Sequence, residues 1–172
     1  IKHGGVIGTQ NKYIALIRDT LLNVARMFPK LLSFFDFYHP WQIDNGLIDK
    51  SLYPNKANGI VISQPSLDIK VDNKPFDQFI GYSFALIVFD QNEILFNDIK
   101  ALESSKIFEN NIYLIDKDSP FNEDSNFIKW KKDNNISAVI IRPDRHVYGC
   151  CDDESMITKV DELNKKLISE LT

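Results

Sequence analysis

The stretch "AVIIRPDRHVYGCCDD", residues 138–153, carries the clearest strand and turn signals of this 172-residue chain. An apolar run precedes Arg142, and a second short run follows His146. Pro143 presets the backbone for a tight turn, and Asp144 suits the position after it. We therefore predict a β-hairpin in which Arg142, Pro143 and Asp144 have a structural role. Arg142 either pairs with a nearby acid or reaches a partner domain.

Both cysteines of the chain, Cys150 and Cys151, end this stretch. Neighbouring residues of a strand point to opposite faces, so the two thiols do not suit one metal ion. A disulfide between sequence neighbours would also strain the backbone. Regular alternation would group Cys150 with Tyr148, and Cys151 with Val147. The pattern favours a structural role for both thiols over a redox role.

Working outward from the hairpin, apolar periodicity predicts alternating strands and helices. They are a strand over 82–90, a helix over 91–105, a strand over 111–116, a helix over 124–135, the hairpin, and a helix over 152–171. Strands joined by helices are expected to pair in parallel, and the tight turn adds one antiparallel pair. The order β-α-β-α-β-β-α predicts an α/β thioredoxin-like domain, with a central mixed sheet flanked by helices.

Upstream of this unit the pattern is more irregular. The sequence predicts a short strand over 59–65, a half-exposed strand over 66–75 and a short helix over 74–81. Residues 44–58 are rich in turn formers and are interpreted as a connector. The thioredoxin-like domain is expected to span 59–172.

Residues 1–43 are predicted to form a helical arm. Apolar residues between Tyr13 and Val24 recur at helical spacing, and large aromatic residues follow them. The arm is either the end of an upstream flavin or substrate domain, or a helix packed on the core of this chain. Periodicity leaves both readings open.

The chain lacks the residues that thioredoxin-like redox chemistry needs. A Cys-x-x-Cys motif is expected after the first central strand, but the segment "FALIVFDQNEILF" contains no cysteine. Ser137 occupies the place where a cis-proline is expected. His3, His39 and His146 lack metal-binding spacing, and "GGVIG" does not match a dinucleotide fingerprint. We assign no catalytic, cofactor-binding or metal-binding residue in this chain.

Composition and charge argue against some classes of partner and indicate a cellular compartment. The net charge of −4 argues against a nucleic-acid partner. No apolar run of about 18 residues exists, so we expect no membrane contact. Two cysteines without a signal peptide indicate a cytoplasmic protein.

Two stretches resemble a known family. "NISAVIIRPDRHVYGC" (135–150) and "GIVISQPSLDIKVDNKPFDQFIGYSFALIVF" (59–89) are similar to the C-terminal portion of FAD-dependent aromatic-ring hydroxylases, above all the 3-(3-hydroxyphenyl)propionate hydroxylase type. The resemblance is strongest over 59–90 and 136–149. It implies a parent enzyme, a monooxygenase of phenolic compounds, that binds FAD and NAD(P)H upstream of this chain.

The resemblance implies a supporting role for the chain itself. In this family the thioredoxin-like C-terminal domain lacks redox cysteines and serves packing, subunit contacts and cover for the active site. The expected partners are the upstream flavin-binding domain and further copies of the same protein. Two alternatives stay open, a free-standing thioredoxin-like protein-binding module and a divergent redox protein that uses Cys150 or Cys151.

Overall fold

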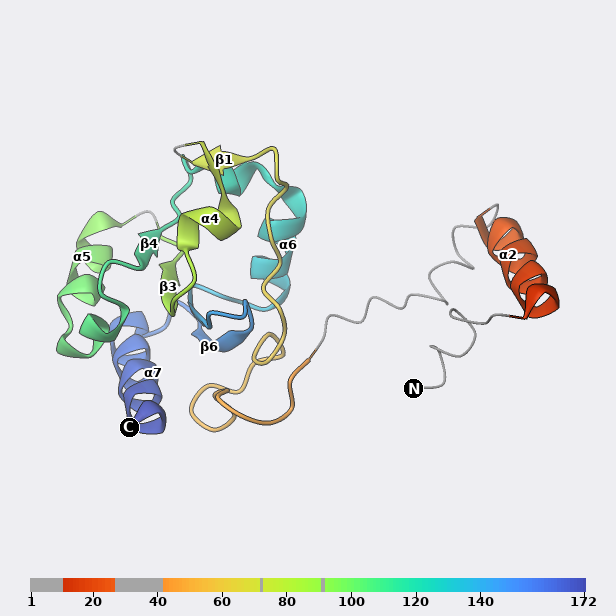
Figure 1. The fold of residues 1–172 in the computed structure, drawn as a ribbon. Helices are drawn as coiled ribbons and strands as arrows, with labels where there is room; N and C mark the ends of the chain where they lie inside the picture. Colours follow the sequence, from red (N-terminus) through yellow and green to blue (C-terminus); the bar gives the residue numbers. More distant parts are fainter. Residues whose placement is uncertain (1–10, 27–41, 72, 91) are drawn as a thin grey trace. The chain divides into compact units, whose positions relative to one another are not determined.

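A computed structural model describes residues 11–26, 42–71, 73–90 and 92–172. The chain divides into two compact units, residues 1–39 and 40–172, and each is described by itself. The described part of the first unit is one helix, α2 (Lys12–Arg26), which lies within the predicted arm. The second unit holds every strand that the described residues form (Figure 1). In the described residues, no helix is both long and apolar enough to cross a membrane.

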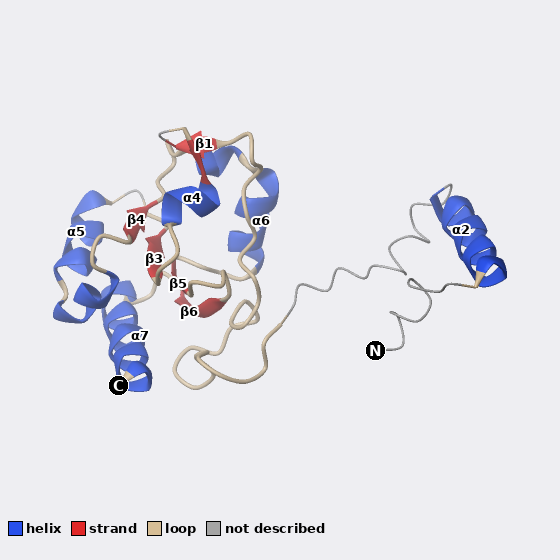
Figure 2. Ribbon diagram, viewed as in Figure 1, coloured by secondary structure: helices blue, strands red, loops and turns tan. Residues whose placement is uncertain are grey.

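The second unit is built on a four-stranded mixed sheet (Figure 2). Its strands are β3 (Ala85–Val88), β4 (Ile112–Leu114), β5 (Ala138–Ile141) and β6 (Val147–Cys151). The spatial order is β4-β3-β5-β6, with β3 and β4 parallel and the other two pairings antiparallel. This arrangement confirms the predicted α/β class with a central mixed sheet and helices around it.

The sheet contains two antiparallel pairings where the sequence predicted one. The reason is the path of α6 (Ser125–Asp133), which ends beside the carboxyl end of β3. There the Phe89 N–H donates to the Ser137 carbonyl at 2.8 Å. β5 therefore begins at that end of the sheet and must run opposite to β3.

A β-bulge changes the faces of the hairpin side chains. Ile140 lies opposite Gly149 while Ile141 lies opposite Val147, so Tyr148 is an extra residue in β6. The bulge interrupts the alternation of faces. Val147 consequently shares a face with Cys150, and Tyr148 shares one with Cys151. The predicted grouping of these side chains is wrong, but the placing of the two thiols on opposite faces is confirmed.

Each face of the sheet is covered by helices. α6 and the short α4 (Phe76–Ile80) pack on the face of Ile87 and Val139. α5 (Glu93–Ala101), the 3-10 helix η2 (Glu103–Phe108) and α7 (Met156–Leu171) cover the opposite face (Figure 1). Burial of a large apolar side chain contributes about 1.5–3 kcal/mol, so these two layers supply most of the stability.

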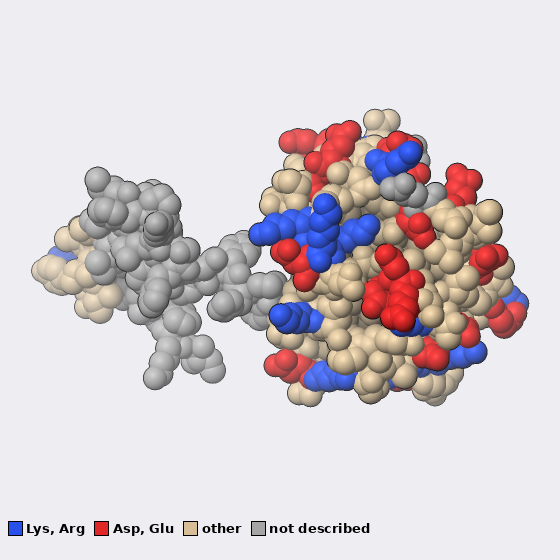
Figure 3. All heavy atoms as spheres, turned by 180° about the vertical axis from the view of Figure 1, so that it is seen from behind, with Lys and Arg blue, Asp and Glu red and all other residues tan. Residues whose placement is uncertain are grey.

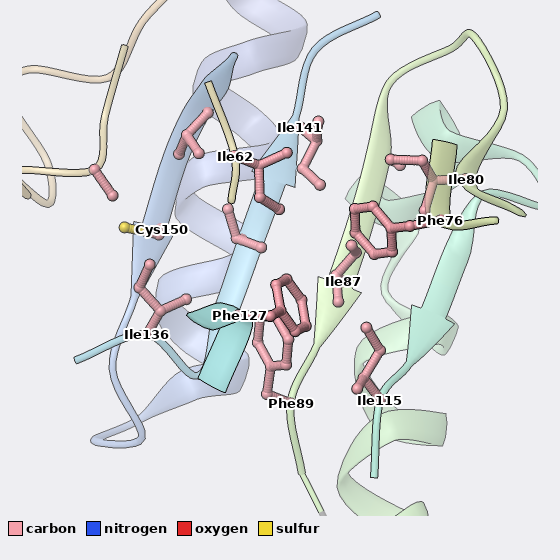
Figure 4. Close-up of a cluster of buried hydrophobic side chains, with 14 of the residues drawn as sticks. Ile62, Phe76, Ile80, Ile87, Phe89, Ile115, Phe127, Ile136, Ile141 and Cys150 are labelled. Carbon is pink, nitrogen blue, oxygen red and sulfur yellow. The ribbon is translucent and has the colours of Figure 1, made fainter. Parts of the chain in front are cut away.

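Aromatic rings fill the layer beneath α6. The Phe89 and Phe127 ring centroids lie 5.7 Å apart, and Phe76 lies 5.5 Å from Phe127 (Figure 4). All three side chains are buried. The sheet and α6 are thereby held in a fixed relation at the carboxyl end of β3.

Residues 42–62, which we name the strap, run along the outer side of β6 (Figure 1). The Val147 N–H donates to the Ile60 carbonyl at 2.9 Å, and the Gly59 N–H donates to the Val147 carbonyl at 2.9 Å. The Asp49 N–H donates to the Tyr148 carbonyl at 2.7 Å. The predicted connector thus packs within the same compact unit as the sheet, and the predicted strand over 59–65 forms only isolated bridges.

The predicted strand over 66–75 is much reduced. It forms a two-stranded ribbon of β1 (Lys70–Val71) and β2 (Lys74–Pro75), outside the main sheet. The short helix that follows is present as α4 and ends at Gly81, whose φ of 68° favours glycine.

Candidate functional site

A cavity of about 800 Å³ opens beyond the carboxyl ends of β3 and β4. Phe89 and Asp90 directly follow β3, and Ile115 and Asp116 directly follow β4. The carboxyl ends of parallel strands are where ligands most often bind in α/β sheets. The volume lies within the range of roughly 300–1,000 Å³ that is usual for ligand sites.

Three helix ends complete the walls of this cavity. Helix α6 contributes Ile128 from its first half and Lys131 and Lys132 from its last turn. The first turns of α5 and α7 contribute Leu95 and Met156. The cavity is therefore lined by an apolar floor together with charged side chains of both signs.

Lys131 is the charged residue most affected by this environment. Its side chain is half-buried, and Nζ lies 5.0 Å from the Phe89 ring centroid. Burial lowers the pKa of Lys131 below its ordinary value, although Asp153 and Asp90 act in the opposite direction. Among the described residues, no carboxylate oxygen lies within 4.0 Å of this ammonium group.

The two helices that start beside the cavity differ at their first turns. In α5 the Asn92 side chain accepts from the Ile94 N–H at 3.0 Å and from the Leu95 N–H at 3.4 Å. In α7 the N-cap residue Ser155 makes no side-chain cap hydrogen bond, and the first turn holds no acid. The first turn of α7 thus keeps backbone N–H groups that a side chain does not satisfy.

Charges of both signs occur together on the surface (Figure 3) and in the lining of the cavity. Figure 3 shows basic and acidic side chains interspersed over one face of the molecule, without a large patch of one sign. Asp90, Asp116 and Asp153 line the cavity together with its lysines. Any selectivity for charge must therefore come from local geometry.

Neither thiol lies at this site. Cys150 and Cys151 are buried in the two core layers, and the Cys150 thiol donates to Asn58 Oδ1 at 3.3 Å. Burial raises the pKa of Cys150 strongly and that of Cys151 to about 12. Thiols that stay protonated and inaccessible are poor nucleophiles.

Ser137 lies where the thioredoxin pattern expects a cis-proline, and it lines the cavity. Its N–H donates to the Cys151 carbonyl at 2.8 Å, a bond that proline could not make. The described residues contain no cis peptide bond.

The predicted turn residues lie together at the tip of the hairpin. Arg142 Nη2 lies 2.7 Å from Asp144 Oδ2, and Nη1 donates to the Leu47 carbonyl of the strap at 3.1 Å. Burial alone would raise the pKa of Asp144, but the His146 N–H and the Arg142 guanidinium lower it overall. Pro143 is exposed at the tip. Arg142 thus pairs with a nearby acid.

The histidines do not form a metal centre in the described structure. His146 Nδ1 lies 3.3 Å from Asp144 Oδ1, while His3 and His39 fall outside the described residues. The described part of the chain holds no group of three or more His, Cys, Asp or Glu side chains suited to a metal ion. The residues between β3 and α5 also do not suit the pyrophosphate of a flavin cofactor, because they include no glycine and Asn92 caps the Ile94 and Leu95 N–H groups at the start of α5.

Sequence reasoning missed the cavity and its central lysine. One signal was available, since both buried strands end in an acid, "VFD" at Asp90 and "LID" at Asp116. Lys131 gave no signal, because its distance from Phe89 depends on how α6 packs on the sheet.

Comparison with known proteins gives limited guidance. No protein-family model and no curated protein sequence matches the chain. One solved structure that it resembles is the substrate-free form of the rebeccamycin biosynthetic enzyme REBC, at 15% sequence identity and a TM-score of 0.40. The match covers 88% of this chain and 28% of that protein.

Proposed function

We propose that this chain is a non-catalytic, thioredoxin-like domain of a larger FAD- and NAD(P)H-dependent monooxygenase that hydroxylates phenolic compounds of the 3-hydroxyphenylpropionate type. One observation carries the non-catalytic role. The sheet has the strand order of a thioredoxin-like domain, while both thiols lie buried in β6 and no cysteine follows β3. The family itself is supported by the sequence resemblance over 59–90 and 136–149.

The domain's role in the parent enzyme is packing and subunit contact. Helix α2 supports this role, because Tyr13, Leu16 and Ile17 are exposed by 67%, 66% and 61%. Apolar residues gathered on one helix face favour contact with another protein surface. The proposed partners are the flavin-binding domain of the same protein and a second subunit. The flavin supplies the oxygen chemistry, and no residue of this chain takes part in it.

Purification of the protein encoded by the complete natural gene tests this proposal. We expect bound FAD, and NAD(P)H oxidation that phenolic acids stimulate. The 172-residue chain alone should bind no flavin. Replacement of both cysteines by serine in the complete protein should leave hydroxylation unchanged, as long as the variant stays folded.

Two results would contradict the proposal. A natural gene product without flavin would favour a free-standing binding module. Loss of hydroxylation in a folded Cys150→Ser or Cys151→Ser variant would instead favour a redox role for the thiols.

A further inference from the structure

The cavity places the positive charge of Lys131 beside an apolar floor. The Lys131 side chain is half-buried, and its ammonium carries three donors that no described carboxylate meets within 4.0 Å. Phe89 and Ile115, both buried, form the adjoining apolar surface. A partly desolvated cation beside apolar surface is stabilised by an anion whose body is also apolar.

The first turn of α7 adds a second element of positive potential. Helix α7 has 16 residues, and its first residue, Met156, lines the same cavity as Lys131. The Met156 N–H donates to the Asp153 carbonyl at 3.3 Å, so the next N–H groups of this first turn are the ones that can favour negative charge. The neighbouring α5 does not compete, since Asn92 already satisfies its first turn.

We propose that this cavity binds a small organic carboxylate with an apolar body. The carboxylate lies between the Lys131 ammonium and the first turn of α7, and the body lies on Phe89, Ile115 and Ile128. Asp90, Asp116 and Asp153 also line the cavity and disfavour ligands that carry several negative charges, such as polyphosphates. The site therefore selects monoanions. This inference does not rest on the activity of the parent enzyme.

Titration of the full 172-residue chain, followed by ¹H–¹⁵N NMR, tests the proposal. The probes are benzoate, its neutral analogue benzamide, and acetate. We expect benzoate to shift the amide signals of Phe89, Lys131 and Met156, and to bind more tightly than either other probe. Benzamide lacks the charge, and acetate lacks the apolar body.

Two variants of α6 provide a matched comparison. Lys131→Met keeps an apolar stem over Phe89 but removes the charge, and it should weaken benzoate binding about tenfold. Lys129→Met removes a lysine of the same helix that is 75% exposed and 4.0 Å from Asp133, and it should bind benzoate as the parent chain does. Lys131→Arg should retain most of the affinity for benzoate. That result would show that the positive charge at position 131 contributes more to binding than the packing of the lysine stem does.

Three outcomes would overturn the proposal. They are an absence of shifts around the cavity with all three probes, equal binding of benzoate and benzamide, and unchanged benzoate affinity in a folded Lys131→Met variant. The NMR readout needs no flavin and no turnover. Failure here is therefore distinct from failure of the proposed monooxygenase function.

Discussion

Asp49 shows how one side chain can hold a long segment in place. Its carboxylate is fully buried and accepts from the backbone N–H groups of Ser51, Leu52 and Tyr53 at 2.8–3.2 Å. The Lys166 ammonium of α7 donates to Asp49 Oδ1 at 2.6 Å. One carboxylate therefore ties the strap both to itself and to the last helix.

Asp49→Ala should destabilise the domain by about 3–5 kcal/mol, because Lys166 and three backbone donors lose their acceptor. The free energy of unfolding in urea measures the effect. As a control, Glu103→Ala removes an exposed pair with Lys106 and should cost less than about 1 kcal/mol. A similar loss in both variants would contradict the role of Asp49.

The same carboxylate gives a dependence on pH. Burial tends to raise the pKa of Asp49, but Lys166 and the backbone donors lower it overall to below its ordinary value. A lowered folded-state pKa stabilises the protein above the unfolded-state pKa, and this stabilisation is lost as the pH falls through the folded-state value. The difference in free energy of unfolding between the unmutated chain and Asp49→Ala should consequently become smaller below about pH 4.

The two thiols should be unreactive in the folded chain. Both are buried, and the raised pKa of about 12 for Cys151 leaves very little thiolate at pH 8. We expect labelling by a disulfide reagent to be slow in buffer and complete for both thiols in urea. Rapid labelling of the native chain would show that the core layers open readily around β6.

Packing of α7 on β6 depends on the absence of a side chain at Gly149. A Cβ atom there would lie 2.9 Å from Leu163 Cδ2 and 3.1 Å from Asp49 Cβ. Gly149→Ala should therefore destabilise the domain by about 1–3 kcal/mol. Leu163→Ala in the same chain makes room, so a double-mutant cycle should show a smaller effect of Gly149→Ala in that background. Additive effects would indicate that helix and strand are not in close contact at this position.

The hairpin tip offers a milder test. Pro143→Gly should cost roughly 0.4–1 kcal/mol, mainly because glycine gives the unfolded chain more freedom. The denaturation midpoint in urea measures the change. A midpoint equal to that of the parent chain would mean that Pro143 does not restrict the turn.

Local patterns predicted the central elements well and their surroundings less well. The strands around Ile87 and Val139 were predictable because they are apolar on both faces. The bulge at Tyr148 was not, since it depends on the strap and α7 beside β6. The cavity depends likewise on the packing of α6, so only Asp90 and Asp116, which follow β3 and β4, indicated it in the sequence.

The division of the chain suggests where it can be cut. Because Asp49 is buried and Asn58 donates to the Asp49 and Tyr53 carbonyls at 2.9 Å, the strap belongs to the folded unit. A chain that begins at Pro40 should fold, whereas one that begins at Asn58 should be markedly less stable. Thermal unfolding compares the two directly, and equal stability would show that the strap contributes little.

The shortened chain also tests the arm. Exposed Tyr13, Leu16 and Ile17 should promote self-association of the full chain, and removal of residues 1–39 should give a more monomeric product in sedimentation. Phe34, Phe35, Phe37 and Trp41, which we also expect to contribute, lie outside the described residues. A monomeric full chain together with an unfolded Pro40 chain would instead indicate that the arm packs on its own core.

The strap also affects how readily the sheet can pair with other chains and aggregate. An exposed outer strand invites another chain to extend the sheet, which is a common route to aggregation. By bonding to Val147 and Tyr148, the strap blocks this route at β6. At the opposite border, β4 offers only three residues, too few to template a long pairing. A sheet with one border partly covered and the other kept short resists growth into fibres, and loosening of the strap would weaken that protection.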